Sequence, residues 1–386
     1  MARVNSLEKA RKKQSRKLIL KRMLTSILLV VVIAVVYLHR IEIATLGFMA
    51  WVEESISEQF STHSFPVELP KSSQKQLIAL GPRVGVVQDS GVSVYNSVGD
   101  WMYDLRTAYQ HPKAASSSKR LALFDIGAYS LRQVAGDKVI YERTFDHPIS
   151  SVKLSPGHKM AVSTGETRYL SKVIVFSKDL NEIFAWSSSE LYVTAMALSD
   201  RSLATAGVKT KGGMLCSDIT LLSLKSDVPK YVVPLEDELV YHLELIGDDS
   251  LLVLTNQSAL RINASGNVDA KTPLSTHLGA FAVGKSGELW VVSGDYATSR
   301  RTELVKYGED LKQQQALPLD YPVKSLLTYK DGLVVFGGDY ARLYDSELKL
   351  INTIPTPDAI TAMVSGSHLY YATQSSLNRV SLGAKD

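Results

Sequence analysis

Histidine side chains are the first place to look for metal or acid–base chemistry in this chain. A metal site on one helix face needs ligands at short spacing, such as two histidines four residues apart. The eight histidines are scattered, and no two have that spacing. His158 and His368 fall in turns between strands, so we expect structural or solvent-facing roles, and we predict no metal site.

Nucleophilic and phosphate chemistry have little support. Cys216 is the single cysteine, and it lies in an apolar stretch with no histidine beside it in the sequence. This favours a buried small hydrophobe over a nucleophile. No Gly-x-Ser-x-Gly elbow, phosphate-binding loop or EF-hand pattern occurs. We therefore expect no catalytic residues and no cofactor, and we interpret the chain as something other than an enzyme.

One polar-aromatic motif repeats. The sequence Gly-Asp-Tyr-Ala stands at 294–297 and again at 338–341, 44 residues later. At equivalent edges of adjacent repeats, its side chains could hydrogen-bond a ligand or partner. The alternative is a turn contact that recurs because the repeats share ancestry. The candidate binding surface consists of Asp295, Tyr296, Asp339 and Tyr340.

These motifs belong to a repeat of about forty residues, a length typical of propeller blades. Each copy has an apolar strand, a tight turn with Ser, Gly or Asp, and a second apolar strand, as at 151–162 and 280–291. A hairpin of two further strands follows, as at 173–186. Four antiparallel strands per repeat form the blade of a β-propeller, in which each sheet packs between its neighbours. The pattern predicts an all-β fold.

Counting first strands gives eight blades. Seven is the alternative if the least regular region, from His111 to Phe145, is miscounted. The last repeat contains three strands before the chain runs out, and residues 64–70 resemble the outer strands of other blades. We therefore predict that residues 64–70 complete the last blade and close the ring. The predicted blades start near Gln76, Pro112, Ile149, Val193, Val240, Gly279, Val323 and Ile360.

The order of strands and turns over 64–384 resembles that of WD40-like and quinoprotein-like β-propellers. The resemblance implies the fold alone. The Gly-His and Trp-Asp dipeptides of WD40 repeats do not recur at blade spacing, and Gly99-Asp100-Trp101 is a degenerate trace of the quinoprotein signature.

The chain before the repeats carries a membrane signal. Residues 23–38 read MLTSILLVVVIAVVYL, without a charge. As a helix they cover about 24 Å of a hydrocarbon core about 30 Å thick, and Lys21, Arg22 and Arg40 would snorkel outward. Because no small-x-small cleavage site follows, we expect an uncleaved transmembrane signal anchor over 23–40 rather than a cleaved signal peptide.

An amphipathic stalk is expected after the anchor, over 41–63, with Trp51 near the membrane interface. The basic tail, 1–22, holds nine basic residues and one acid, and the rest of the chain has a net charge of −4. The overall charge of +4 thus arises from the basic tail, which we interpret as a topology signal. It gives no support for nucleic-acid binding. The tail is expected in the cytoplasm and the propeller, 64–384, outside a cell membrane that the chain crosses once.

A basic tail, one anchor and a cysteine-poor propeller together resemble a group of membrane-anchored propeller proteins from Gram-positive anaerobes. The resemblance implies location and fold and brings no activity with it. Besides the lipid bilayer, we expect a protein or cell-envelope partner that binds the propeller as a scaffold. The alternative is an extracytoplasmic small-ligand receptor or enzyme that uses the central channel.

Overall fold

The computed structural model describes residues 64–274, 278–284, 286–294 and 302–383. Within these ranges the regular elements are all β-strands, and no helix is long and apolar enough to cross a membrane. The predicted tail, anchor and stalk lie outside the described residues, and so do the four candidate residues of the anchor. These four are the anchor residues Lys21, Arg22, Arg40 and Trp51.

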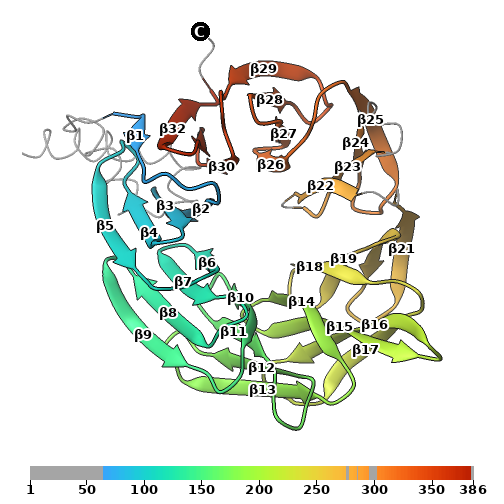
Figure 1. Cartoon of the computed structure of the whole chain (residues 1–386). Coiled ribbons are helices and arrows are strands. Elements are labelled where there is room, and N and C mark those ends of the chain that lie inside the picture. Colours follow the sequence, from blue (N-terminus) through green and yellow to red (C-terminus); the bar gives the residue numbers. More distant parts are fainter. Residues whose placement is uncertain (1–63, 275–277, 285, 295–301, 384–386) are drawn as a thin grey trace, which may run out of the picture. The chain divides into compact units, whose positions relative to one another are not determined.

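The described strands form eight four-stranded antiparallel sheets, which follow one another around a ring (Figure 1). Seven sheets are continuous in the sequence and run from the innermost strand, a, to the outermost strand, d. The first four are β2–β5 (Gln76–Leu80, Arg83–Gln88, Gly91–Tyr95, Trp101–Arg106), β6–β9 (Pro112–Ser117, Arg120–Asp125, Ser130–Ala135, Lys138–Thr144), β10–β13 (Ile149–Leu154, Met160–Thr164, Ser171–Phe176, Glu182–Ser188) and β14–β17 (Tyr192–Leu198, Ser202–Lys211, Met214–Ser223, Pro229–Leu235).

The next three blades repeat this order, and the eighth combines both ends of the described chain. The fifth to seventh blades are β18–β21 (Val240–Ile246, Ser250–Thr255, Ser258–Ile262, Val268–Pro273), β22–β25 (Leu278–Val283, Leu289–Gly294, Thr302–Tyr307, Gln313–Leu319) and β26–β29 (Ser325–Tyr329, Gly332–Phe336, Tyr340–Tyr344, Leu350–Pro355). The eighth has the strand order β30 (Thr361–Ser365), β31 (His368–Ala372), β32 (Ser376–Ser381) and β1 (Val67–Glu68).

Burial explains why these segments form sheets. Second strands such as β11 and β27 are buried at every position, because a neighbouring blade covers each face. Outermost strands such as β5 alternate between more and less exposed residues. The buried apolar side chains divide into eight clusters, each shared by two adjacent blades. The ring is therefore stabilised by its blade-to-blade interfaces.

The ring closes through the N-terminal strand. Val67 pairs with Leu377, and the Leu69 N–H donates to the Ser375 carbonyl at 2.7 Å. Leu69 and Leu377 are buried in the cluster between the last and first blades, together with Leu77 of β2. The predicted pairing of residues 64–70 with the last blade is thus confirmed.

The blade count is eight, as predicted. The region from His111 to Phe145, which left seven blades open, forms the complete sheet β6–β9. Every innermost strand begins within two residues of its predicted start.

Replacing Leu69 by alanine tests the closure. The Leu69→Ala variant should lose about 2–4 kcal/mol of unfolding free energy in a urea titration, because it leaves a cavity in the cluster that joins the last blade to the first. Leu350→Ala, at an exposed position of β29, is the control and should stay within about 0.5 kcal/mol of wild type. Equal stabilities for the two variants would show that residues 64–70 do not hold the ring closed.

Candidate binding face

The two faces of the ring are formed by different loops. The four strands of each blade are called a, b, c and d, from the innermost to the outermost. Every strand a starts on one face of the ring, and this face carries the b–c loops and the loops that join each strand d to strand a of the next blade. We call this the DA/BC face. The a–b and c–d turns form the opposite side, the AB/CD face.

Polar groups of the AB/CD face bond neighbouring blades to one another. The Ser117 hydroxyl donates to the Ser155 carbonyl at 2.7 Å, and the Ser155 hydroxyl donates to the Asp200 carboxylate at 2.5 Å. In the next interface the Ser199 hydroxyl donates to the Asp248 carboxylate at 3.0 Å. These bonds link four successive blades, and their carboxylates therefore have structural roles.

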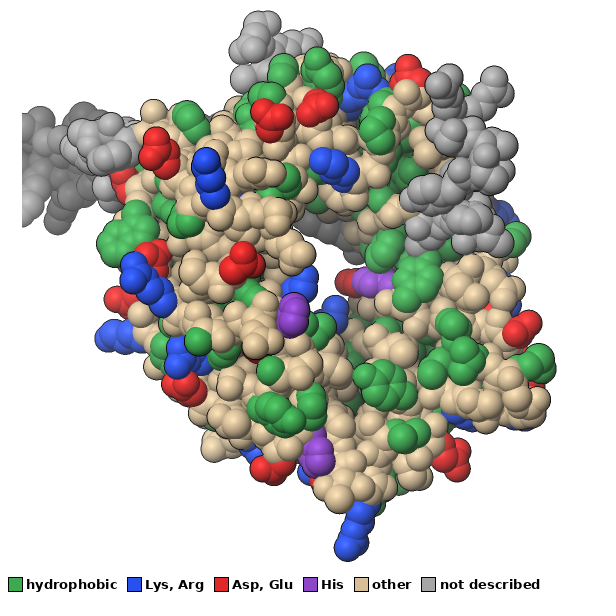
Figure 2. Space-filling model, in the orientation of Figure 1, with side chains coloured by type: hydrophobic (Ala, Val, Ile, Leu, Met, Phe, Trp, Pro, Cys, Tyr) green, Lys and Arg blue, Asp and Glu red, His purple; other side chains and the backbone are tan. Residues whose placement is uncertain are grey.

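Exposed large hydrophobic side chains collect on the DA/BC face. The others lie on the outermost strands at the rim, apart from Val228 in a c–d turn of the AB/CD face. Figure 2 shows the DA/BC face, with hydrophobic side chains in several groups around the central opening. Exposed apolar groups that gather on one surface mark interaction sites more often than scattered ones do. Those of the DA/BC face are Ile126, Tyr129, Tyr169, Leu170, Tyr192, Met214, Leu215, Tyr241 and Tyr340.

A hairpin of the fourth blade extends beyond its sheet on this face. β15 and β16 have ten residues each, whereas the longest strands of the other blades have seven. Their neighbours β14 and β17 pair only as far as Val208 and Ser217, so the hairpin beyond these residues pairs only with itself. The turn is Gly212-Gly213, with φ angles of 61° and 83° that suit glycine. Its tip, defined here as Met214 and Leu215, is 57% and 51% exposed.

A buried carboxylate fixes the loop before Tyr241 in the fifth blade. Glu238 accepts hydrogen bonds from the Thr255 hydroxyl at 2.6 Å and the Ser258 hydroxyl at 2.5 Å, and it pairs with Lys271. Burial alone would raise the pKa of Glu238, but the bonds from Lys271, Ser258 and Thr255 outweigh it and lower the pKa. The ionised carboxylate therefore joins two loops of the DA/BC face.

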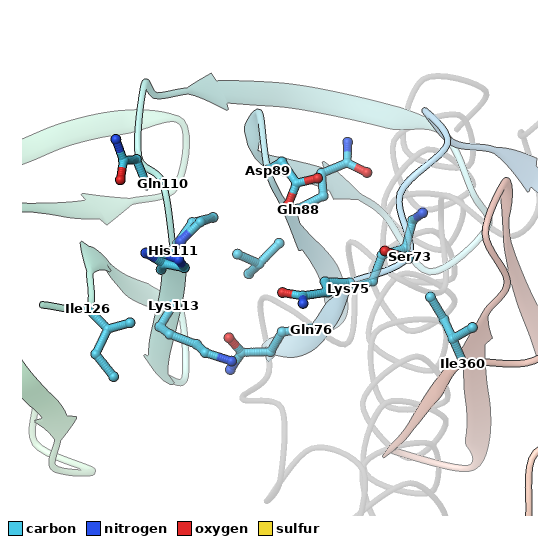
Figure 3. Close-up of a pocket in the computed structure, with 13 residues that line it drawn as sticks. Ser73, Lys75, Gln76, Gln88, Asp89, Gln110, His111, Lys113, Ile126 and Ile360 are labelled. Atoms are coloured by element: carbon cyan, nitrogen blue, oxygen red, sulfur yellow. The ribbon is translucent and has the colours of Figure 1, made fainter.

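A polar cavity of about 460 Å³ opens on the same face between the first and second blades (Figure 3). Gln76 bridges the blades beside it: its Nε2 donates to the Ala114 carbonyl at 2.9 Å, and its Oε1 accepts from the Ala114 N–H at 3.1 Å. Lys113 of β6 also lines the cavity, and within the described chain its ammonium makes no hydrogen bond or ion pair. The cavity thus has one fixed wall and one available cation.

The innermost strands, around the central opening, expose both charged and aromatic side chains. Lys113, Lys153, Glu244, Tyr192 and Tyr241 are among them, and Glu244 Oε2 lies 3.4 Å from His242 Nε2. Figure 2 shows basic side chains on one side of the opening and a histidine with an acidic side chain on the other. Within the described ranges, no group of three His, Cys, Asp or Glu side chains could hold a metal ion.

Of the predicted binding residues, the structure describes Asp339 and Tyr340. Both are exposed in the b–c loop region of the seventh blade, and the Asp339 carbonyl accepts a 2.7 Å hydrogen bond from the Thr356 N–H. Tyr340 therefore lies on the DA/BC face, while the Asp339 backbone fastens the following d–a loop. Asp295 and Tyr296 lie outside the described residues, so the two copies of the motif are not compared. Cys216 is buried, as predicted.

Sequence reasoning missed the hairpin tip and the cavity. The Gly212-Gly213 turn between two long strands was a usable signal for the hairpin. Nothing in the sequence marks Lys113, because its role depends on how the first blade packs against the second.

The chain belongs to a family of unknown function, DUF5711, whose model matches residues 59–382. No curated protein matches its sequence.

Several solved propeller structures are similar in fold. BamB from Moraxella catarrhalis matches with a TM-score of 0.57 and 12% identity, over 82% of this chain and 96% of that one. The computationally designed protein Ika8 has a TM-score of 0.64 and 8% identity, over 81% and 98% of the two chains. A structure described as the eukaryotic initiation factor has a TM-score of 0.60 and 12% identity, over 85% and 90%. At these identities the likeness shows the fold alone.

The Glu238→Gln variant tests whether the ionised Glu238 carboxylate stabilises the two loops that it joins on the DA/BC face. At pH 7 it should lose about 1–3 kcal/mol of unfolding free energy, because a charged hydrogen-bond acceptor is removed. The folded-state pKa lies below the unfolded value of about 4.3, so the wild-type advantage is complete above that pH and shrinks as the pH falls.

Urea titrations from pH 7 to pH 3 check this dependence. Glu236→Gln removes a carboxylate of the same loop whose ion pair with Lys211 is exposed, and it should change stability by less than about 1 kcal/mol. A Glu238→Gln deficit that is the same at pH 7 and pH 3 would contradict the assignment of the ionised carboxylate.

Proposed function

Starting from this family membership, we propose that the chain is a non-enzymatic interaction scaffold that presents its DA/BC face to a protein partner. In this proposal the N-terminal segment anchors the chain in a cell membrane, and the propeller lies on the extracytoplasmic side, where a protein or another component of the cell envelope binds it.

The asymmetry between the two faces carries the proposal. Exposed tyrosines and aliphatic side chains lie around the opening of one face, while the polar groups of the other bond adjacent blades together. Tyrosine is enriched at protein interfaces because it offers a large contact area with one polar end. The projecting tip formed by Met214 and Leu215 adds apolar area that the propeller itself does not cover.

Charge favours a protein over a nucleic acid as the partner. The loops of the DA/BC face carry exposed side chains of both signs, including the acidic Glu190 and Asp358 and the basic Arg168 and Lys211. Phosphate backbones are bound by surfaces with a clear excess of basic side chains. A mixed surface with tyrosines matches a protein interface better.

The membrane component rests on the sequence. The uncharged run at 23–38 and the basic tail before it are typical of a signal anchor whose N-terminus stays in the cytoplasm.

A matched pair of double variants tests the scaffold. Met214→Ser with Leu215→Ser alters the hairpin tip, and Leu350→Ser with Ile351→Ser alters an equally exposed pair on the rim. In membranes of the native cells, chemical crosslinking of the tip variant should give about tenfold less of the partner adduct, because buried apolar anchors dominate binding energy. The rim variant should match wild type.

Both variants should unfold at the wild-type urea midpoint, since all four side chains are exposed. Equal adduct yields from the tip and rim variants would contradict the assignment of the DA/BC face.

Cysteine labelling tests the topology. Cys216 is buried, so it gives a low background. With a membrane-impermeant maleimide, Asp227→Cys in an exposed turn of the propeller should be labelled in intact cells, and Ser6→Cys in the basic tail only after permeabilisation. The reverse pattern would contradict the proposed orientation.

A small-ligand receptor is the second candidate, and one observation favours it. The polar cavity of about 460 Å³ at the edge of the opening has a size suited to a small molecule.

A further inference from the structure

The chain enters the propeller on the AB/CD side. β1 is the outermost strand of the eighth blade, and an outermost strand begins on the face of the c–d turns, so residues 64–66 lie on that side. The side chains of Phe65 and Val67 lie against Gly99 in the c–d turn of the first blade. The entry point is therefore fixed between the last and first blades, on the side opposite the DA/BC face.

Exposed apolar side chains continue along this side of the rim. β5, β9 and β13 follow β1 around the ring (Figure 1), and each begins on the AB/CD side. Trp101, the first residue of β5, is 60% exposed, and its Nε1 donates to the Asp104 carboxylate at 3.0 Å. Val139 and Ile183, the second residues of β9 and β13, are exposed as well. Tryptophan is enriched where a membrane meets water, because its ring is apolar and carries one polar N–H group.

The turns of the AB/CD face differ in charge around the ring. Counted with the strand residues that bound them, the a–b and c–d turns of the first three blades hold six basic and four acidic residues. Those of the fourth to seventh blades hold six basic and ten acidic residues. Blades one to three are thus the basic part of this face, and they adjoin the point of chain entry.

Three lysines of these turns have free ammonium groups. Those of Lys119, Lys138 and Lys178 make no hydrogen bond or ion pair within the described chain. Arg120 donates to the Lys178 carbonyl at 2.5 Å, which joins the a–b turn of the second blade to the c–d turn of the third. Lys138 directly precedes the exposed Val139. Free cations and exposed apolar side chains therefore share one edge of the propeller.

We propose that this edge binds anionic lipid headgroups at the membrane surface. We call it the docking edge, and it consists of Trp101, Val139, Ile183, Lys119, Lys138 and Lys178. Its apolar side chains enter the interface while its lysines pair with acidic headgroups, and the two contributions add in interfacial binding. The inference rests on the membrane anchor of the proposed function, and it leaves the DA/BC face turned toward the partner.

Fluorescence quenching of the full-length chain in lipid vesicles tests the proposal. A fluorophore is attached at Val139→Cys or, as the matched control, at Ile351→Cys, the exposed second residue of β29. The vesicles contain phosphatidylglycerol and a phosphatidylcholine with a nitroxide on its headgroup. Quenching at position 139 should exceed quenching at position 351 about twofold or more, because only the docking edge lies among the headgroups. Equal quenching at the two positions would overturn the proposal.

Two sets of alanine variants of the Val139→Cys chain test the role of charge. The first set removes the three lysines of the docking edge, and the second removes three exposed lysines from turns of the sixth and seventh blades, Lys312, Lys330 and Lys349. The first set should lower the excess quenching by about half or more, as should vesicles of phosphatidylcholine alone, and the second set should leave it unchanged. All these side chains are exposed, so the urea midpoint should stay at the wild-type value. Equal effects of the two sets, or the full excess in phosphatidylcholine alone, would refute binding to anionic headgroups.

Flotation of the vesicles on a density gradient separates this inference from the proposed function. A chain with a membrane anchor floats with neutral and anionic vesicles alike, whatever its docking edge does. Flotation together with equal quenching at positions 139 and 351 would rule out the docking edge and leave the anchor standing. A chain that stays at the bottom of the gradient would rule out the anchor, and with it the inference that rests on it.

Discussion

Closure of the ring by β1 is the constraint on which the rest of this structure depends. Each blade buries both faces of its sheet against neighbours, so an open ring would leave two apolar surfaces in water. Pairing of Val67 with Leu377, and burial of Leu69 in the last interface, remove that exposure. The propeller therefore needs neither a disulfide nor a metal to account for its closure, and the two ends of the described chain meet in one sheet.

Closure also leaves the two faces free to differ. On the AB/CD face, short turns bond across the blade interfaces through residues such as Ser155 and Asp200. The DA/BC face instead carries the long hairpin of the fourth blade, exposed tyrosines and the polar cavity between the first two blades. Fixed turns on one side give these features a rigid base, as a binding surface requires.

Much of the fold could be predicted because it depends on local patterns. Alternation and turn residues mark nearly every strand, and the missing fourth strand of the last blade identifies 64–70 as its partner. The candidate site was less accessible to prediction. The Asp-Tyr motif indicated Tyr340, which does lie on the DA/BC face, but Met214, Leu215 and Lys113 become significant only through contacts, or missing contacts, that packing creates.

The DA/BC face is the proposed interaction surface of the propeller, and site-specific photo-crosslinking in the native cells tests this most directly. A photoreactive side chain would be placed at Tyr192 or Tyr340 on the DA/BC face, and at Lys119 or Asp227 in exposed turns of the AB/CD face. The account predicts one discrete partner adduct from the first two positions and none from the other two. Adducts from Lys119 and Asp227, with none from Tyr192 or Tyr340, would contradict it.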